Sequence, residues 1–179
     1  MDGSPSPERY LGSRGINLIG PASERDAIAA KLASAGSVAI DGGTFDAIRV
    51  SSRIPTHPAE LNEERNPWEA RLDGSISLVK GCYIGQEVVA RLDTYKKVHR
   101  SLVHLDLDGD ALPAVRAPVV HEGRDVGYVS SAVVNPRTGR VEALGYLLGD
   151  LAEPGKIVTV GGASGRVDPV EPWAKAQGA

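Results

Sequence analysis

The chain has few of the features that mark secreted, membrane-spanning or nucleic-acid-binding proteins. It contains one cysteine, Cys82, which cannot form an internal disulfide and favours a reducing compartment. No apolar run approaches the roughly 20 residues needed to span a bilayer, and the N-terminal "MDGSPSPER" has no apolar signal segment. A formal net charge of −3 provides no general basic surface for nucleic acid or anionic lipid. We therefore expect a cytoplasmic protein that makes no membrane contact, and direct nucleic-acid binding is not expected.

Aromatic residues and metal-ligand motifs are also scarce. Aromatics make up 4% of the chain and hydrophobic residues 41%, so the core must consist mainly of Val, Leu, Ile and Ala. The four histidines, at positions 57, 99, 104 and 121, are scattered, and no H-x-x-x-H or C-x-x-C spacing occurs. We therefore predict no metal site. The length of 179 residues allows one ordinary domain or two small ones.

The front of the chain alternates helical and extended patterns. A helix is predicted over 23–36, where Ser23 can cap the start, Asp26 lies three residues on, and Gly36 can end the helix. In "NPWEARL", Asn66 can cap a second helix, with Glu69 completing the capping box. The remaining predictions are a broken strand at 10–21, a short strand and turn at 37–43, a short helix at 44–50, a loop at 51–65, extended chain at 73–79 and a short helix at 85–92.

From about residue 98 the pattern changes to short alternating segments separated by Gly, Pro and Asp turns. "HEGRD" and "NPRTGR" are typical of hairpin turns, so this part should be antiparallel β, a small barrel or sandwich. We divide the chain into a disordered lead-in at 1–9, an α+β part at 10–97, a β module at 98–171 and a tail at 172–179.

Cys82 lies in "KGCYIGQEVVARL", just before the predicted short helix. The partial positive charge of the helix start and the nearby Lys80 would favour a thiolate. Free cysteine is also among the most buried residue types, and no histidine lies near it in sequence to act as a base. The residues alone therefore allow either a small buried apolar side chain or a reactive thiol. Within the helix, Glu87 and Arg91 have the spacing of a stabilising ion pair.

This segment resembles the signature of the YgfZ-type folate-binding proteins, relatives of the glycine-cleavage T-protein (aminomethyltransferase). T-proteins usually carry an acidic residue in place of Cys82 and an arginine in place of Gln86, so both residues are similar to the YgfZ branch. The segment "LPAVRAPVVHEGRDVGYVSSAVVNPRTGRVEALGYLL" resembles the C-terminal β-barrel of that superfamily, including its "vG.vtS" segment at Val126 to Ser130. The resemblance covers roughly residues 10–171 and matches the latter half of the family pattern.

The resemblance implies a fold class and a cofactor. The expected fold is α+β, the C-terminal part of a ferredoxin-like folate-binding lobe followed by a small antiparallel β-barrel domain. Tetrahydrofolate is the implied cofactor, held in a channel between lobes. Three positions depart from the family pattern on the side that faces the pterin: Asn17 replaces an acid, Ser51 a glutamate and Arg53 a glycine. An amide accepts through only one oxygen, so Asn17 should weaken pterin binding. The arginine indicates that the pocket wall has moved or that the pocket is filled.

Site residues follow from the same resemblance. The candidate folate-binding residues are Asn17, Arg49, Lys80, Tyr83, Gln86 and Arg91, and Cys82 is the candidate reactive thiol. Each also has a structural alternative: Lys80 solvated, Tyr83 in the core, Gln86 at the helix start and Arg91 paired with Glu87. The catalytic aspartate of aminomethyltransferases comes from the family's N-terminal domain and has no counterpart in the residues that carry the resemblance.

Three functions are compatible with these residues. The first is a tetrahydrofolate-dependent accessory factor that supports iron–sulfur enzymes and tRNA modification, with iron–sulfur proteins as partners. The second is an aminomethyltransferase that moves a one-carbon unit to tetrahydrofolate. The third is a truncated remnant that binds no folate alone and needs a separate N-terminal half. We favour the first as the family identity and regard the third as a qualification of its activity.

Overall fold

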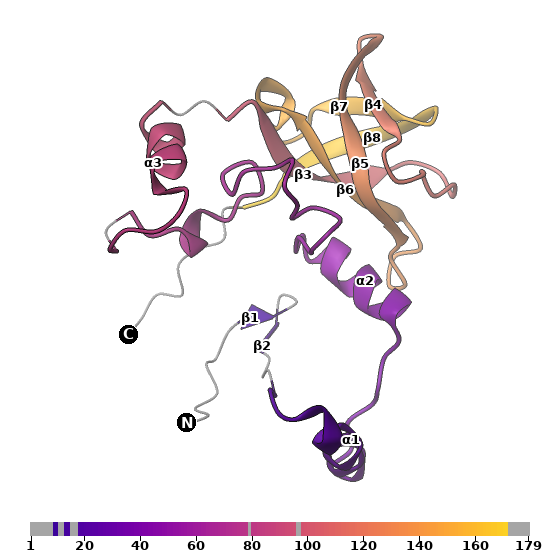
Figure 1. Cartoon of the computed structure of the whole chain (residues 1–179). Coiled ribbons are helices and arrows are strands. Elements are labelled where there is room, and N and C mark those ends of the chain that lie inside the picture. The colour runs from indigo at the N-terminus through magenta and orange to yellow at the C-terminus, as the bar shows by residue number, and fades with distance from the viewer. Residues whose placement is uncertain (1–8, 11–12, 15–17, 79, 96–97, 172–179) are drawn as a thin grey trace.

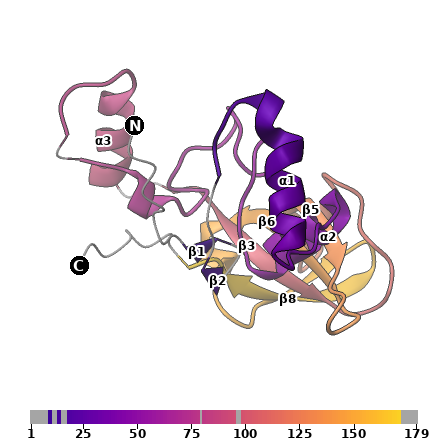
Figure 2. The same cartoon turned by 90° about the horizontal axis from the view of Figure 1, so that it is seen from below.

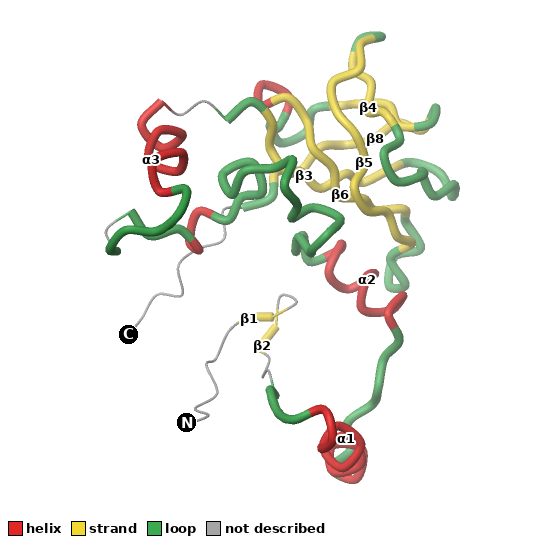
Figure 3. Tube along the Cα trace, in the orientation of Figure 1, coloured by secondary structure: helices red, strands yellow, loops and turns green. Residues whose placement is uncertain are grey.

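The computed structural model describes residues 9–10, 13–14, 18–78, 80–95 and 98–171. In these residues the C-terminal part of the chain, which we call the back, forms a closed β-barrel, and the N-terminal part, which we call the front, consists mainly of helices and turns (Figures 1 and 3). The front elements are β1 (Arg9–Tyr10), β2 (Ser13–Arg14), η1 (Ala22–Glu24), α1 (Arg25–Ser34), α2 (Gly42–Ser51), η2 (Asp73–Ser75) and α3 (Gln86–Tyr95). The back elements are β3 (Arg100–Leu107), β4 (Pro118–His121), β5 (Arg124–Val134), β6 (Val141–Leu148), η3 (Gly149–Leu151), β7 (Ile157–Val160) and β8 (Ala163–Pro169).

The barrel is antiparallel throughout, with strand order β3-β6-β5-β4-β7-β8. It closes because β3 pairs with β6 on one side and with β8 on the other, which leaves no free sheet edge in this order. Glu122 and Gly123 form the turn between β4 and β5, and residues 135–140 connect β5 to β6. The prediction of a small antiparallel barrel with hairpin turns at these two places is confirmed.

The barrel interior is aliphatic, as the low aromatic content predicts. Alternate residues of each strand point inward, and the fully buried interior residues are branched aliphatics or alanine. The cluster comprises Val103, Leu105, Leu107, Val119, Val126, Val129, Val141, Ala143, Leu147, Leu151, Val158, Val160 and Val167. A second cluster lies outside the barrel wall, where Val50 of α2 packs against Leu102, Leu144, Tyr146 and Val170. This second cluster fixes α2 to the barrel.

The front differs from the prediction in two details. The helix at 23–36 forms as α1, and Gly36 ends it with a φ of 89°. Ser23 does not cap it, because Ser23 lies inside the 3-10 turn η1 and no side chain caps the helix. The strand predicted at 37–43 is wrong. This segment runs without a sheet partner among the described residues, and Asp41 at its end caps α2 by accepting a hydrogen bond from the Thr44 amide at 2.7 Å.

The capping box of "NPWEARL" forms, but the helix that it should start does not continue. Glu69 N donates to Asn66 Oδ1 at 2.9 Å, and Asn66 N donates to Glu69 Oε2 at 3.4 Å. After one turn the chain is held by β3 instead, since Leu102 N donates to the Glu69 carbonyl at 2.8 Å. The helices predicted at 44–50 and 85–92 are confirmed as α2 and α3, and the loop at 51–65 is confirmed as a series of turns.

The front elements spread away from the barrel. Helix α2 lies against β5 and β6, whereas α1 has no buried residue and lies apart from the barrel in Figure 1, with a second view in Figure 2. In the described residues the front holds one strand pair, β1 with β2, so the ferredoxin-like lobe stays a prediction, as do the exact domain limits. None of the helices in the described ranges is long and apolar enough to cross a membrane.

The glycine of the "vG.vtS" segment is required by close packing of strands. A Cβ built on Gly127 would lie 2.0 Å from the carbonyl oxygen of Tyr146 on β6. The Cβ is attached to the backbone of β5 and the oxygen belongs to the backbone of β6, so neither can move without disturbing the pairing of these two strands. The glycine therefore sets how closely β5 and β6 approach.

We expect Gly127→Ala to prevent the barrel from folding stably, because a backbone clash at this distance is not relieved by a side-chain rotation. Thermal unfolding monitored by far-UV circular dichroism measures the effect. The matched control is Gly42→Ala at the start of α2, where a Cβ meets nothing within 4 Å. A Gly127→Ala chain that melts with the same cooperativity and midpoint as the Gly42→Ala chain would disprove this account of the glycine.

Candidate functional site

The signature segment forms an exposed loop, residues 80–85, that leads into α3; we call it the signature loop. Cys82 is exposed at its centre, so the interpretation of this cysteine as a buried apolar residue is wrong. Gly85 adopts a φ of 89°, a left-handed conformation that favours glycine, and its carbonyl accepts from Val89 N at 3.1 Å in the first turn of α3. The second glycine of the segment therefore serves to turn the chain into the helix.

Two of the candidate folate-binding residues contact each other in this loop. The Lys80 ammonium lies 4.6 Å from the centre of the Tyr83 ring, a cation–π geometry. Lys80 is exposed and Tyr83 half-buried, so the pair presents a positive charge and one aromatic ring at the surface.

The other two candidates of this segment lie on α3. Gln86 is half-buried, and its backbone N–H donates to the Tyr83 carbonyl at 3.2 Å. Arg91 pairs with Glu87, as predicted from their spacing, and both side chains are largely exposed. The ion pair leaves Arg91 on the solvent side of the helix.

Apolar side chains of the same segment are exposed as well. The side chain of Ile84 is fully exposed and that of Val88 is 62% exposed. Exposed large apolar residues near a cationic and aromatic pair are typical of a surface that a ligand or partner covers. The signature loop and the first turn of α3 thus form the candidate site.

The remaining two candidates lie elsewhere. Asn17 falls outside the described residues. Arg49, at the C-terminal end of α2, is 4% exposed and donates hydrogen bonds to three protein side chains: Asp46 at 2.6 Å, Glu60 at 3.1 Å and Ser131 at 2.8 Å. The structure therefore brings Lys80, Cys82, Tyr83 and Gln86 together and keeps Arg49 in the interface between α2 and the barrel.

The partner of Arg49 is a fully buried carboxylate, which the sequence analysis did not identify. Glu60 has no exposed surface. Its Oε2 accepts from Arg49 Nη1 at 3.1 Å and from the Thr56 amide at 3.0 Å, and its Oε1 accepts from Ser130 and Ser131, each at 2.7 Å. These four hydrogen bonds, one of them from the Arg49 guanidinium, compensate the cost of burying the charge.

A β-bulge makes this arrangement possible. The β5–β6 register shifts between Val129 and Ser131, so Ser130 is an extra residue in β5. In a regular strand, successive side chains point to opposite faces, but here both serine hydroxyls reach the same oxygen of Glu60. The serine of the "vG.vtS" segment therefore holds the 51–65 loop on the barrel.

Arg53 stands where the family pattern has glycine, and its backbone explains the pattern. Its φ is 62°, in the left-handed region where glycine is favoured. Its side chain points to the barrel, where it donates to Asp168 Oδ2 at 3.1 Å and to the Pro169 carbonyl at 3.2 Å. Arg71 repeats this arrangement, with a φ of 60° and a hydrogen bond from Nε to the Val170 carbonyl at 3.1 Å.

A second buried polar group lies beside these residues. His104 of β3 is 6% exposed and its Nε2 lies 3.3 Å from Glu142 Oε2 on β6. Burial lowers the pKa of His104, and the nearby Arg53 charge lowers it further, against the opposing effect of Glu142 and Asp168. Burial alone would raise the pKa of Glu142, but the polar side chains of Ser51, Asn135 and His104 bring it below its ordinary value. His104 is therefore neutral in the folded protein near neutral pH.

No group of three His, Cys, Asp or Glu side chains is close enough to hold a metal ion in the part of the chain that the structure describes. The chemistry that the candidate site offers is thus an exposed thiol, a lysine ammonium and an aromatic ring, on a surface with exposed aliphatic side chains.

Comparisons with known proteins relate the barrel to one family. Residues 100–175 match the family model of the glycine cleavage T-protein C-terminal barrel domain. Among named relatives, a chloroplastic protein of Arabidopsis thaliana that carries the name of a transferase is 34% identical over 130 residues, covering 73% of this chain and 30% of the relative. An aminomethyltransferase of Herpetosiphon aurantiacus is 30% identical over 132 residues, covering 73% of this chain and 36% of the relative. An aminomethyltransferase of Thermosynechococcus vestitus is 27% identical over 151 residues, covering 84% and 41%.

A solved structure agrees in fold. The glycine cleavage system aminomethyltransferase T from Bartonella henselae superposes with a TM-score of 0.68 at 16% identity, over 87% of this chain and 45% of that one. The chain spans less than half the length of each of these relatives. Together the matches support a relationship to the C-terminal part of the T-protein superfamily.

Replacing the buried carboxylate tests whether it holds the 51–65 loop on the barrel. We expect Glu60→Gln to lower the free energy of unfolding by about 3 kcal/mol, because the buried ion pair with Arg49 is lost and Asp46 is left as the one carboxylate paired with that guanidinium among the described residues. Urea denaturation followed by circular dichroism measures the change. Glu63→Gln, an exposed neighbour, serves as the control and should change the stability by less than about 0.5 kcal/mol. Equal stabilities of the two variants would contradict the role given to Glu60.

The buried histidine predicts a pH dependence of stability. Since the pKa of His104 is lower in the folded chain than its ordinary value of 6.5, the unfolded chain binds more protons as the pH falls below 6.5. Stability should therefore fall with decreasing pH in that window, by up to about 1.4 kcal/mol per pH unit. His104→Gln should flatten this slope, whereas His99→Gln, an exposed histidine, should leave it unchanged. Urea denaturation at pH 7.5, 6.5, 5.5 and 5.0 gives both slopes, and identical slopes would refute the assignment.

Proposed function

We propose that this chain is the barrel-and-signature part of a T-protein-like protein that binds tetrahydrofolate and acts as an accessory factor of the YgfZ type. The observation that carries the proposal is the exposed signature loop, in which Lys80, Cys82 and Tyr83 stand together beside α3. The match of residues 100–175 to the T-protein barrel domain supports the T-protein-like part of this proposal. On this proposal the role in iron–sulfur enzyme maintenance and tRNA modification depends on the thiol at Cys82.

The donor set fits a folate only in part. Lys80 and Arg91 offer positive charge for the carboxylates of the glutamate tail, and Tyr83 offers a ring for stacking. Arg49 already donates to Glu60 and Ser131, and Arg53 to Asp168 and the Pro169 carbonyl, so both arginines hold acceptors of the protein itself. We therefore propose that a separate N-terminal half supplies the pterin contacts and covers the exposed aliphatic side chains of the signature loop.

Two alternatives stay distinct from this proposal. The first alternative is an aminomethyltransferase, which is the name that several relatives carry. The resemblance implies that this activity needs an aspartate from the N-terminal domain of the family. In the arrangement proposed here, the separate N-terminal half would supply that aspartate. A remnant without folate binding would leave the signature loop exposed in every complex. The experiment below separates the three outcomes.

The test is a calorimetric titration with 5-formyltetrahydrofolate, with this chain alone and mixed with the N-terminal part of the Thermosynechococcus vestitus aminomethyltransferase. We expect the mixture to bind at least ~10-fold more tightly than the chain alone, since the second half buries the ligand. In the mixture, Lys80→Ala should weaken binding about 10-fold through the loss of one charge-assisted hydrogen bond. The matched control is Lys31→Ala on α1, which should bind as the unmodified chain does.

Thiol labelling gives an independent readout. The exposed Cys82 is the only cysteine, so Ellman's reagent should modify it at once in the isolated chain, and the folate-loaded mixture should protect it. Transfer of an aminomethyl group above background in the mixture would favour the aminomethyltransferase instead. Absence of folate binding in both the chain and the mixture would leave the remnant as the correct assignment.

A further inference from the structure

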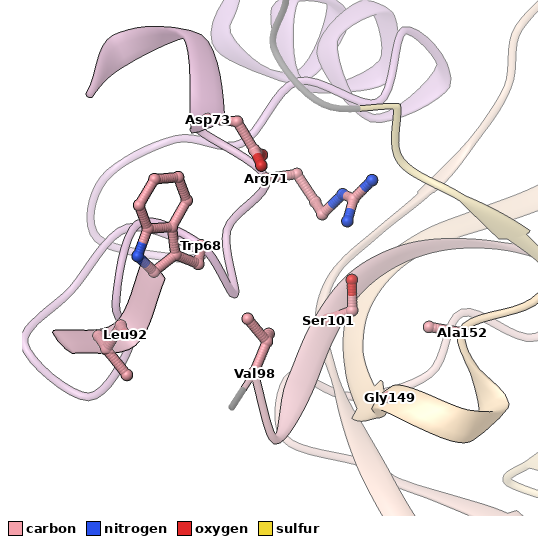
Figure 4. Close-up of a pocket in the computed structure, with 8 residues that line it drawn as sticks. All are labelled: Trp68, Arg71, Asp73, Leu92, Val98, Ser101, Gly149 and Ala152. Carbon is pink, nitrogen blue, oxygen red and sulfur yellow. The ribbon is translucent and has the colours of Figure 1, made fainter. Parts of the chain in front are cut away.

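A cavity of about 470 Å³ lies where the 66–75 turn meets the start of β3, and the described residues of the signature loop do not line it. The volume is in the range of small-molecule sites. Arg71 and Ser101 supply polar groups to the lining, as Figure 4 shows. The apolar part of the lining consists of Trp68, Leu92, Val98 and Ala152.

Two hydrogen bonds of the surrounding chain bring Arg71 and Ser101 to the same cavity. Leu102 N donates to the Glu69 carbonyl at 2.8 Å, which holds the start of β3 against the 66–75 turn. Arg71 Nε donates to the Val170 carbonyl at 3.1 Å, just after β8, the strand that pairs with β3. The two polar side chains therefore stand at one junction, although they lie far apart in the sequence.

The guanidinium of Arg71 is fixed at one nitrogen and open at the other two. Its terminal nitrogens have no acceptor and no ion-pair partner in the part of the chain that the structure describes. The bond at Nε sets the plane of the group, so the two terminal nitrogens form an oriented fork of donors. Arg71 also has a left-handed φ of 60°, a conformation that costs free energy in a residue with a side chain and recurs at ligand clamps.

The hydroxyl of Ser101 adds a third donor beside this fork. It has no hydrogen-bond partner among the described residues, and Figure 4 shows it directed toward the terminal nitrogens of Arg71. A guanidinium fork matches the two oxygens of a carboxylate, and a hydroxyl can donate to either of them. Asp73 lies in the same lining, and its negative charge opposes a ligand with two charges more than a ligand with one.

We propose that this cavity binds a small monocarboxylate with an aliphatic or aromatic body. The carboxylate accepts hydrogen bonds from the terminal nitrogens of Arg71 and from the Ser101 hydroxyl. The body of the ligand packs against the ring face of Trp68 and the aliphatic side chains of Leu92 and Val98. This site is separate from the proposed folate site and does not depend on it.

Trp68 provides the readout. The sequence has two tryptophans, so Trp173→Phe leaves Trp68 as the sole reporter in the full-length chain. Cyclohexanecarboxylate, titrated at constant ionic strength, should change the emission with a Kd of about 0.1–3 mM. Cyclohexanecarboxamide has nearly the same shape without the charge and should bind at least ~10-fold more weakly. Cyclohexyl phosphate, which carries about two negative charges at pH 8, should bind at least ~3-fold more weakly.

A pair of arginine variants separates a ligand contact from a structural one. Arg71 and Arg53 each donate a hydrogen bond to a carbonyl at the end of β8, but Arg53 does not line the cavity. Arg71→Gln should weaken cyclohexanecarboxylate at least ~10-fold, whereas Arg53→Gln should bind as the parent does. Ser101→Ala should weaken it about 3- to 10-fold through the loss of one hydrogen bond. Circular dichroism verifies that each variant is folded.

Four results would overturn the proposal. The first is no emission change up to about 30 mM cyclohexanecarboxylate, well above the expected Kd. The second is equal affinity for the carboxylate and the carboxamide, which would make the cavity a purely apolar site. The third is tighter binding of the phosphate than of the carboxylate. The fourth is an equal loss in Arg71→Gln and Arg53→Gln, which would make the role of Arg71 structural. Because none of these measurements uses a reduced folate or the N-terminal half, failure here is distinguishable from failure of the proposed function.

Discussion

Glu60 is a carboxylate without exposed surface, and the attachment of the front of the chain to the barrel depends on how its charge is compensated. Arg49 comes from α2, Thr56 from the connecting loop, and Ser130 and Ser131 from the barrel wall, so one side chain joins three parts of the chain. The hydroxyl of Tyr146 adds a hydrogen bond to the Glu60 carbonyl at 2.9 Å. Because an isolated buried charge is far more costly than a paired one, these contacts stabilise the attachment of α2 and the 51–65 loop to the barrel. The second apolar cluster includes Val50, which follows Arg49 in the chain, and Tyr146, which is bonded to the Glu60 carbonyl. The same contacts therefore hold this cluster in place.

The molecule thus has a closed part and an open part. The barrel pairs its strands with one another in a closed order and buries an aliphatic cluster in its interior. The front keeps Ile19, Ile84 and Val88 exposed, and the parts of it that pack closely on the barrel are α2 and the 51–72 segment. The exposed thiol of Cys82 and the Lys80–Tyr83 pair lie in the open part, on the signature loop.

The sequence predicts the local features of this structure well. The hairpin turns, α2, α3 and the Asn66–Glu69 capping box all depend on residues close together in the chain, and each is present. The aliphatic core follows from composition, since aromatic residues are few. The strand predicted at 37–43 does not form, because its apolar alternation had no neighbouring strand to pair with among the described residues.

The features that could not be predicted depend on long-range contacts. The sequence suggests Arg49 as a ligand contact because no local pattern pairs it with Glu60. The serines that complete this arrangement come from a β-bulge in β5, which depends on the pairing of β5 with β6. A buried glutamate between loop residues has no sequence pattern of its own. In the candidate site, the signature marked the loop by resemblance. The cavity that Trp68, Ser101 and Ala152 help to line was not predicted, because its residues come from segments far apart in the chain.

Arg53 and Arg71 have a mechanical consequence. Both use a left-handed backbone to direct a long side chain at the same place, the last residues of β8 and the residue that follows it. A terminal strand that pairs with β3 and β7 would ordinarily peel off one hydrogen bond at a time when the chain is pulled beyond residue 170. Here the guanidinium groups of Arg53 and Arg71 donate hydrogen bonds to the carbonyls of Pro169 and Val170. A pulling force on this end of β8 therefore also acts on the 51–72 segment and, through it, on the contacts between α2 and the barrel. Force applied to the end of the barrel is thereby shared with its front, and β8 resists unzipping from its exposed end.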